Sequence, residues 1–527
     1  MQLDGHPQAV ARVTGDPGTG DAGVPRAGDG PATARAPWPR ASLGLLVVLL
    51  AALTALRLAG LSVSAVDLFY DEAQYWNWAQ DLAFGYFSKP PLLAWLLAGT
   101  RHICGDGEFC TRAPAPVIYF ITSLLVYATA RRLYDERTAF WAALLTALTT
   151  GVVFSARVIS TDVPLLMFWS LALLAYVRLL AAPTLGWGLV LGLAIGLGLL
   201  SKYAMIYFLP GMLLAALASR PARDLLRTRA FAAALGVASV VVLPNLVWNA
   251  SHRFITLWHT SDLVLGEEFK PGIVRLAEFL GSQFGVFGPV VFATMIVTLF
   301  RLRTNRLTEP DRLMVAFYVT PLVVVTLITT VVRAYANWAS PAAISGLILT
   351  AALLLRERWT GWLPASIALG LVMQATLLAG DALALRIPAS FAGFSNPYRR
   401  TLGWQAYAAR VGDLAREVHP AAIANDNRGD IAVLRYYLRD QSLPILSWGT
   451  SDNPYFDSAH PLTDAAPEPV LFVTSCASTD RLAAFYAEIK PLGHFVATFG
   501  TSGTHAFRAF LLAKRRAPIG ALEQCND

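Results

Sequence analysis

Charged residues are scarce in this sequence. Asp, Glu, Lys and Arg together make up 15% of the chain, whereas soluble globular proteins average roughly 25%. The stretches 138–156, 230–249, 313–332 and 359–380 contain none of them. Each approaches the ~20 apolar residues that cross a bilayer as a helix. One such stretch alone could be a buried core helix, but their recurrence argues against a soluble protein and predicts a polytopic α-helical membrane protein.

The sequence has no loop of the kinds that hold nucleotides. It contains neither a G-x-x-x-x-G-K-[ST] loop nor a strand-linked G-x-G-x-x-G. Both motifs bind phosphate groups through glycine-rich backbone. A nucleotide-linked substrate held in this way is therefore not expected.

Cysteine is also rare, with four residues in the chain. Cys104 and Cys110 lie close together in one predicted outer loop. In an oxidising compartment this spacing predicts a disulfide bridge, with two free thiols as the alternative. No His–Cys cluster of zinc-site spacing surrounds them.

The excess of positive charge, +7 in total, lies largely in short connectors between apolar stretches. Arginines cluster in 131–137, 220–229, 301–312 and 356–358. Lys and Arg near span ends resist translocation and mark cytoplasmic loops. With the N-terminus inside and about eleven spans of helical length, every cluster falls on the cytoplasmic side. No basic patch indicates a nucleic-acid partner.

These spans suggest three regions. Residues 1–40 hold six Pro and seven Gly, which predicts a disordered cytoplasmic tail. Residues 41–380 form the predicted transmembrane domain, with a first outer loop at 66–112. Residues 381–527 mix short apolar runs with helix-like stretches, which predicts a C-terminal α/β domain on the non-cytoplasmic side. The expected spans are 41–65, 113–130, 138–156, 163–181, 187–201, 203–219, 230–248, 283–300, 313–332, 341–355 and 359–380.

The first outer loop opens with two adjacent carboxylates, Asp71 and Glu72, among many aromatic residues. In a helix that begins at Tyr70, Asp71 and Tyr75 share a face, while Glu72 points about 100° away. Trp and Tyr suit the lipid headgroup zone, so this helix is expected to lie along the bilayer surface. The plain alternative is a helix start, where acidic residues are favoured.

Cations stand at three predicted membrane boundaries. Lys89 precedes two prolines, whose restricted backbone fixes its position. Arg333 lies at the outer end of a span, and Lys202 lies between two apolar runs. Each can bind a lipid phosphate. The alternatives are a snorkelling arginine and a connector lysine that faces water.

Other polar residues accompany these cations. Asp162 lies in the second outer turn, where the chain re-enters the membrane. A carboxylate there is either solvated or faces a functional cavity. Asn337 and Trp338 follow Arg333 closely and can contact a sugar or a prenyl head.

Two motifs and one carboxylate carry a family resemblance. The first loop reads Asp71-Glu-Ala-Gln-Tyr and then Gly85-Tyr-Phe-Ser-Lys-Pro-Pro-Leu, and Asp162 follows in the second outer turn. Together they resemble the membrane glycosyltransferases of the GT-C fold over about residues 41–380. The nearest branch looks like the bacterial aminoarabinose and galacturonic acid transferases of lipid A, and protein O-mannosyltransferases are more distant. Ser88 stands where aminoarabinose transferases often have Glu, so the motif looks more like galacturonic acid transferases.

The resemblance implies a polyprenyl-phosphate sugar as donor and inversion at the anomeric carbon. It implies that Asp71 is the catalytic carboxylate, which we expect Glu72 and Asp162 to support. It also implies that Lys89 contacts the lipid phosphate or an acid group of the donor. Further donor-phosphate contacts are expected from Arg333 and Lys202, and substrate contacts from Tyr75, Tyr86, Asn337 and Trp338.

The expected acceptor is lipid A, lipopolysaccharide or another envelope glycolipid, with a protein as the alternative. The expected location is the bacterial inner membrane, with the active site facing the periplasm. The sequence leaves open the sugar, the acceptor and whether a divalent metal assists. A transporter is the rival class, but transporter sites usually lie near the bilayer midplane between repeated halves. Here the carboxylates lie at the outer edge, and no repeat is visible.

Overall fold

The computed structural model describes residues 42–256, 272–303, 306–388, 390–391, 394–449, 459–476, 480–501 and 503–522. Contacts divide the chain into two units, Met1–Arg40 and Ala41–Asp527. The predicted disordered tail lies outside the described residues. All features described below belong to the second unit.

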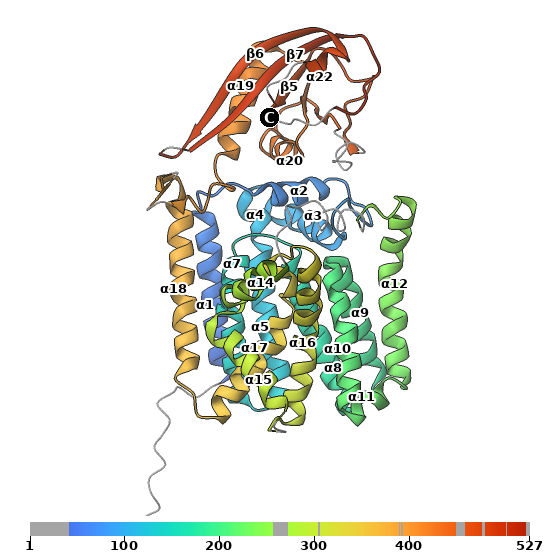
Figure 1. Ribbon diagram of the computed structural model, residues 1–527, viewed down its shortest axis with the longest axis vertical. Coiled ribbons are helices and arrows are strands. Elements are labelled where there is room, and N and C mark those ends of the chain that lie inside the picture. Colours follow the sequence, from blue (N-terminus) through green and yellow to red (C-terminus); the bar gives the residue numbers. More distant parts are fainter. Residues whose placement is uncertain are drawn as a thin grey trace, which may run out of the picture. The chain divides into compact units, whose positions relative to one another are not determined.

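Within the described ranges, six helices are long and apolar enough to cross a membrane, which agrees with the predicted polytopic class. A further candidate is the pair α14 and α15, which is bent by 119°. Figure 1 shows the six long helices as an upright bundle. They are α1 (Leu43–Ser62), α4 (Glu108–Arg112) continuing into α5 (Pro114–Leu133), α8 (Asp162–Ala181), α12 (Arg229–Ser251), α16 (Glu309–Val331) and α18 (Trp362–Ala382), with α14 (Gly272–Phe287) and α15 (Pro289–Leu302) as the bent pair.

The predicted count of eleven spans is not confirmed, because several predicted spans are short or broken helices. The span expected at 138–156 consists of two short helices interrupted at Thr149. The pair expected at 187–219 is interrupted at Lys202. These shorter elements are α3 (Leu92–Cys104), α6 (Glu136–Leu148), α7 (Thr150–Ser155), α9 (Leu185–Ser201), η1 (Tyr203–Tyr207), α10 (Phe208–Ala218), α11 (Arg220–Leu225), η2 (Ala336–Ala339) and α17 (Ala342–Arg356).

Two of the bundle helices approach each other closely through glycine. A Cβ atom added at Gly188 of α9 would lie 2.2 Å from the carbonyl oxygen of Ala230 in α12. At Gly192 it would lie 2.4 Å from the carbonyl oxygen of Ala234. Only glycine permits this approach, and small residues are typical of helix–helix interfaces in membranes.

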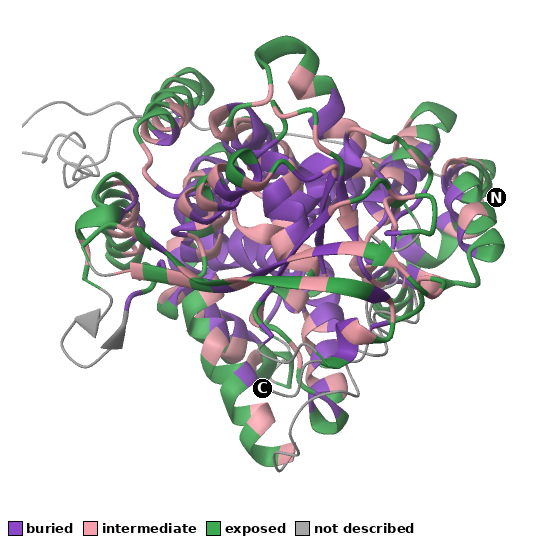
Figure 2. Cartoon of the chain, turned by 90° about the horizontal axis from the view of Figure 1, so that it is seen from above, coloured by how far each residue is buried: buried purple, intermediate pink, exposed green. Residues whose placement is uncertain are grey.

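Large apolar side chains cover the periphery of the bundle. In Figure 2 the outer helices show many exposed positions, whereas buried residues gather toward the middle. Leu217 on α10 is 79% exposed, Val240 on α12 is 70% exposed, and Val372 on α18 is 64% exposed. Soluble monomers rarely expose extensive apolar patches. These surfaces suit the hydrocarbon core of a bilayer.

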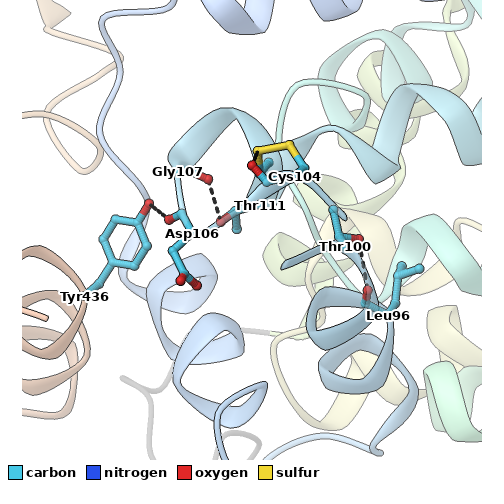
Figure 3. Close-up of a disulfide and its surroundings, with 8 residues drawn as sticks. Leu96, Thr100, Cys104, Asp106, Gly107, Thr111 and Tyr436 are labelled. Atoms are coloured by element: carbon cyan, nitrogen blue, oxygen red, sulfur yellow. Dashed lines mark hydrogen bonds between the residues drawn. A yellow bond between two sulfur atoms is a disulfide. The ribbon is translucent and has the colours of Figure 1, made fainter. Parts of the chain in front are cut away.

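The first outer loop forms short helices across one end of the bundle (Figure 1). Its first helix is α2 (Tyr70–Trp78), and a disulfide joins Cys104 at the end of α3 to Cys110 in α4. Figure 3 shows this bridge beside the Asp106 turn, whose backbone carbonyl accepts a hydrogen bond from the Tyr436 hydroxyl at 2.9 Å. The disulfide predicted from the spacing is therefore present, beside a contact with the C-terminal domain.

The C-terminal region contains a small α/β domain, as predicted. Its five-stranded sheet has the order β4-β3-β5-β7-β6. Strand β3 runs parallel to β4 and β5, while β7 runs antiparallel to β5 and β6. The elements of this region are η3 (Ala384–Arg386), β1 (Ser390–Phe391), β2 (Phe394–Ser395), α19 (Trp404–Val418), β3 (Ala422–Asn425), α20 (Arg428–Tyr437), β4 (Ile445–Ser447), β5 (Val470–Thr474), α22 (Asp480–Ala483), β6 (Tyr486–Phe499) and β7 (Gly503–Arg515).

Helix α2 is part of the hydrophobic core of the C-terminal domain. Ala73 and Trp76 of α2 belong to the same buried cluster as Ile431 and Ala432 of α20. The Trp76 ring also meets Tyr436 edge-on, with ring centroids 5.1 Å apart. Burial of this apolar surface stabilises the contact, so residues of the C-terminal domain can reach the outer loop in a fixed geometry.

Candidate active site

The two carboxylates of the first outer loop occupy the first turn of α2 but have different surroundings. The helix begins at Tyr70, and the Glu72 carboxylate accepts the backbone N–H of Phe69 at 3.1 Å. Acidic groups in a first turn are also favoured by the helix dipole. Because consecutive side chains leave a helix about 100° apart, Asp71 and Glu72 point in different directions.

Glu72 forms a buried brace. Its side chain is 3% exposed, and Arg112 of α4 donates to it through Nη2 at 2.7 Å and Nε at 3.0 Å. The backbone N–H of Ile159, in the second outer turn, donates to the same carboxylate at 2.9 Å. Both oxygens are therefore engaged, and Glu72 links α2, α4 and the second outer turn. This position suits the expected supporting role.

Asp71 is more open and meets the C-terminal domain. Its side chain is 37% exposed, and its Oδ1 lies 3.4 Å from Nη2 of Arg428 in α20. Partial burial raises the pKa of Asp71, whereas the positive charges of Arg428 and Lys89 oppose that rise. A carboxylate with a raised pKa is a stronger base when ionised. Asp71 is thus better suited than the braced Glu72 to accept a proton from a bound hydroxyl.

Lys89 lies among the charged groups of this site. Burial lowers the pKa of Lys89, the carboxylates of Asp71 and Asp162 oppose this effect, and Lys202 and Arg428 add to it. Within the described part of the chain, its ammonium group makes no hydrogen bond or ion pair. A desolvated cation without a fixed partner is suited to bind an anion such as a phosphate group.

Asp162 brings together residues from several distant segments. Lys202 donates to its two oxygens at 2.9 and 3.0 Å. Asn337 donates to Oδ2 at 2.7 Å, and Ser340 donates to Oδ1 at 2.8 Å. The structure therefore joins three predicted site residues in one network, and Ser340 is an addition that the sequence analysis did not identify.

The predicted aromatic contacts have different environments. Tyr75 is 5% exposed, and burial together with the charge of Asp71 holds its pKa well above the ordinary value. Tyr86 stacks on Trp78 with ring centroids 4.8 Å apart, and its hydroxyl donates to the backbone oxygens of Trp78 and Asp81. These contacts place Tyr86 in the interior of the loop, where it supports the fold. The expected substrate contact by Tyr86 stays a prediction.

Arg333 and Trp338 lie beyond the outer end of α16. The Arg333 guanidinium carbon lies 5.8 Å from the centroid of the Tyr335 ring. Trp338 packs against a small cluster that contains Phe279 and Val325. Asn337, between them in sequence, is hydrogen-bonded to the Asp162 network. The substrate contacts expected of Arg333 and Trp338 stay predictions.

Arg428 is, besides Ser340, a site residue that the sequence analysis did not identify. It donates through Nη1 to Oε1 of Gln74 at 3.0 Å, and its guanidinium lies 5.7 Å from the Tyr70 ring centroid. It is separated from Asp71 by 357 positions in the chain. One signal was present, because Arg428 lies in a polar run that follows β3, and ligands often bind at the carboxyl ends of parallel strands.

The arrangement combines a partly exposed carboxylate with cations that can hold an anion. Such a site can remove a proton from a hydroxyl and stabilise a departing phosphate group. Among the described residues, no three His, Cys, Asp or Glu side chains gather as a metal site.

Comparisons with known proteins agree with this chemistry. Residues 88–248 match the family described as dolichyl-phosphate-mannose-protein mannosyltransferase. The lipid A galacturonosyltransferase RgtD of Rhizobium johnstonii is 35% identical over 441 residues, which cover 83% of this chain and 91% of that protein. An undecaprenyl phosphate-alpha-4-amino-4-deoxy-L-arabinose arabinosyl transferase of Pseudomonas aeruginosa is 35% identical over 136 residues, or 24% of each chain.

A solved structure shows the same fold. The crystal structure of ArnT from Cupriavidus metallidurans bound to undecaprenyl phosphate has a TM-score of 0.63 and 15% sequence identity, over 89% of this chain and 98% of that chain. This likeness shows the fold, and the extensive similarity to the galacturonosyltransferase identifies the family. The chain belongs to the GT-C membrane glycosyltransferases that include the lipid A galacturonosyltransferase of Rhizobium johnstonii.

Proposed function

We propose that this protein is an inverting glycosyltransferase that moves a galacturonosyl group from undecaprenyl phosphate to lipid A or lipopolysaccharide. The observation that carries the proposal is the partly exposed Asp71 carboxylate together with the nearby charge of the Lys89 ammonium, which makes no hydrogen bond or ion pair with the residues that the structure describes. The 35% identity with a lipid A galacturonosyltransferase supports the choice of sugar and acceptor.

The proposed reaction requires one proton acceptor and one anion site. Asp71 takes the proton of the acceptor hydroxyl while the hydroxyl oxygen attacks the anomeric carbon from the face opposite the phosphate. The bond between the anomeric carbon and the phosphate oxygen breaks, and undecaprenyl phosphate leaves with the electron pair. Lys89 stabilises the negative charge of the leaving group. Attack from the opposite face inverts the configuration of the anomeric carbon.

The proposed site faces the periplasm. The basic residues of the cytoplasmic connectors and the packing of α2 on α20 support a shared outer side for the first loop and the C-terminal domain. A reporter active only in the cytoplasm should be silent when fused at the C-terminus. The same reporter should be active when the chain is cut after Arg303, between α15 and α16. Activity at the C-terminus would contradict the orientation.

Reconstitution of the purified protein in nanodiscs tests the reaction. The nanodisc bilayer contains lipid A and either undecaprenyl-phosphate galacturonic acid or undecaprenyl-phosphate aminoarabinose. Mass spectrometry then identifies the products. We expect a mass increase of lipid A with the uronic acid donor. Turnover of a nucleotide sugar without any lipid carrier would contradict the proposal.

A protein acceptor is the second candidate, because the matching family description names a protein mannosyltransferase. Mass spectrometry of lipid A, core glycolipid and envelope proteins, from cells with and without this protein, separates the two. Sugar that appears only on proteins would replace the lipid acceptor with a protein acceptor.

A further inference from the structure

The C-terminal domain contributes a charged side chain to the proposed catalytic carboxylate. Arg428 is the first residue of α20, and its Nη2 lies 3.4 Å from Oδ1 of Asp71. Its Nη1 donates to Gln74 at 3.0 Å, one helical turn along α2. The guanidinium thus spans the face of α2 from which Asp71 projects.

The position of Arg428 is fixed by its surroundings. The side chain of Asn427 caps α20 and accepts the backbone N–H groups of Gly429 at 2.8 Å and Asp430 at 3.2 Å. Farther along the helix, Asn77 of α2 donates to the carbonyl oxygen of Ala432 at 3.0 Å. The start of α20 is therefore held against α2, and Arg428 does not depend on a flexible loop to reach Asp71.

Arg428 also occupies an unfavourable place for a cation. The N-terminus of a helix carries partial positive charge, and a basic side chain there is repelled by it. Acidic side chains are the ones that stabilise a first turn. The contacts of Arg428 with α2 offset this cost, which points to a role outside α20 itself.

We propose that Arg428 is a positioning residue that orients Asp71 and keeps it ionised for proton transfer, so that the C-terminal domain completes the active site. This inference rests on the proposed function of Asp71. It makes the sugar-transfer step dependent on the docking of α20 against α2. Among the described residues, the titratable and charged groups that interact with Asp71 are Arg428 on α20, Lys89 in the loop before α3, and Glu72, Tyr70 and Tyr75 on α2.

Substitution of Arg428 should change the ionisation of Asp71 in a defined direction. Partial burial raises the pKa of Asp71, and the charge of Arg428 lowers it. Arg428→Met removes that charge, so the pKa of Asp71 should rise and the acid limb of the pH–rate profile should move to higher pH. Arg428→Lys keeps the charge, so the acid limb should lie close to its wild-type pH. The maximum rate should be lower, because the contact with Gln74 is lost.

A matched control lies on the same helix. Arg435 of α20 also binds α2, since its Nε donates to Oδ1 of Asn77 at 2.8 Å. The charges that shift the pKa of Asp71 are those of Arg428, Lys89 and Glu72, and not that of Arg435. Arg435→Met therefore weakens the same interface without changing the charge beside the carboxylate. If Arg428 only held the domains together, the two variants would behave alike.

The experiment uses the full chain in nanodiscs and two readouts. Single-turnover sugar transfer is measured against pH for wild type, Arg428→Met, Arg428→Lys and Arg435→Met. At pH 7 we expect a roughly ten- to hundred-fold loss in Arg428→Met, the usual effect of losing a charge-assisted contact, with donor affinity unchanged. Adding Arg428→Met to Asp71→Asn should cause no further loss, because the arginine acts through that carboxylate.

The second readout does not need activity. Carbodiimide labels protonated carboxyl groups, and peptide mass spectrometry follows the labelling of Asp71 against pH. The pH at which labelling of Asp71 is half-maximal should rise in Arg428→Met and stay unchanged in Arg435→Met. An unchanged midpoint in Arg428→Met, or an equal shift in Arg435→Met, overturns this proposal. Absence of sugar transfer by the wild type, with the midpoint shift present, overturns the proposed function instead.

Discussion

Asp162 and Lys202 form an ion pair between the start of α8 and the end of α9, with Nζ 2.9 Å from Oδ1 and 3.0 Å from Oδ2. This ion pair occupies the ammonium group of Lys202, which the sequence analysis expected to contact the donor phosphate. It leaves Lys89 as the better placed cation for that task. It also distinguishes the two outer carboxylates, since Asp162 is held by four hydrogen bonds and Asp71 is held more loosely.

Asp162→Asn should lower the thermal stability of the protein, because Lys202 loses its charge partner in a poorly solvated site. Removing one partner of a buried pair costs more than removing both. The double variant Asp162→Asn/Lys202→Met should therefore be more stable than the sum of the single losses predicts. Thermal unfolding in nanodiscs measures this. Additive losses would show that the pair is not coupled.

Asp71→Asn should lower the single-turnover rate by about 10²–10⁴-fold, the usual contribution of a general base. The change is isosteric, so folding and donor binding should stay near normal. Asp81→Asn is the matched control, since Asp81 belongs to the same loop and its side chain is 69% exposed. Near-normal transfer by Asp71→Asn together with a dead Asp162→Asn would exchange the proposed roles.

Lys89→Met keeps an apolar stem and removes the charge, and it should weaken binding of undecaprenyl phosphate roughly ten- to hundred-fold. Lys490→Met, at an exposed position of β6, is the control. Arg333→Met should have a similar effect if Arg333 also binds the phosphate. Unchanged donor affinity in Lys89→Met would move the phosphate site elsewhere.

Donor binding should also depend on pH through Lys89. Burial lowers the pKa of this ammonium, and only the protonated form attracts phosphate. As the pH rises, the charge is therefore lost earlier than on an exposed lysine, and donor affinity falls there. Binding curves for undecaprenyl phosphate across the alkaline range test this, and the dependence should be absent in Lys89→Met.

Arg112→Met should destabilise the protein by about 3–5 kcal/mol, the cost of breaking a buried ion pair from one side. The variant leaves Glu72 buried without its guanidinium and frees the backbone oxygens of Val66 and Asp67 that Arg112 also binds. Arg416→Met breaks an exposed pair with Asp413 and should cost about 0–1 kcal/mol. Equal shifts in the unfolding temperature would mean that the brace contributes little.

Several features could be read from the sequence because they depend on local chemistry. Charge-free stretches of helical length indicated the membrane class, because several of them recur and each is long enough to cross a bilayer. The start of α2, the Cys104–Cys110 bridge and the mixed α/β character of the C-terminal domain also follow from short-range patterns. The number of spans was harder to predict from the sequence, because the helix interruption at Thr149 falls within an apolar stretch and the one at Lys202 falls between two.

The partners of the charged residues were decided by tertiary structure alone. Asp71 and Glu72 are neighbours in the sequence, but in the folded protein Glu72 pairs with Arg112 and Asp71 pairs with Arg428. Helical periodicity shows which face of α2 a side chain occupies, but not which distant segment packs against that face. That choice depends on the burial of Ala73 and Trp76 against α20, a contact between regions more than three hundred residues apart.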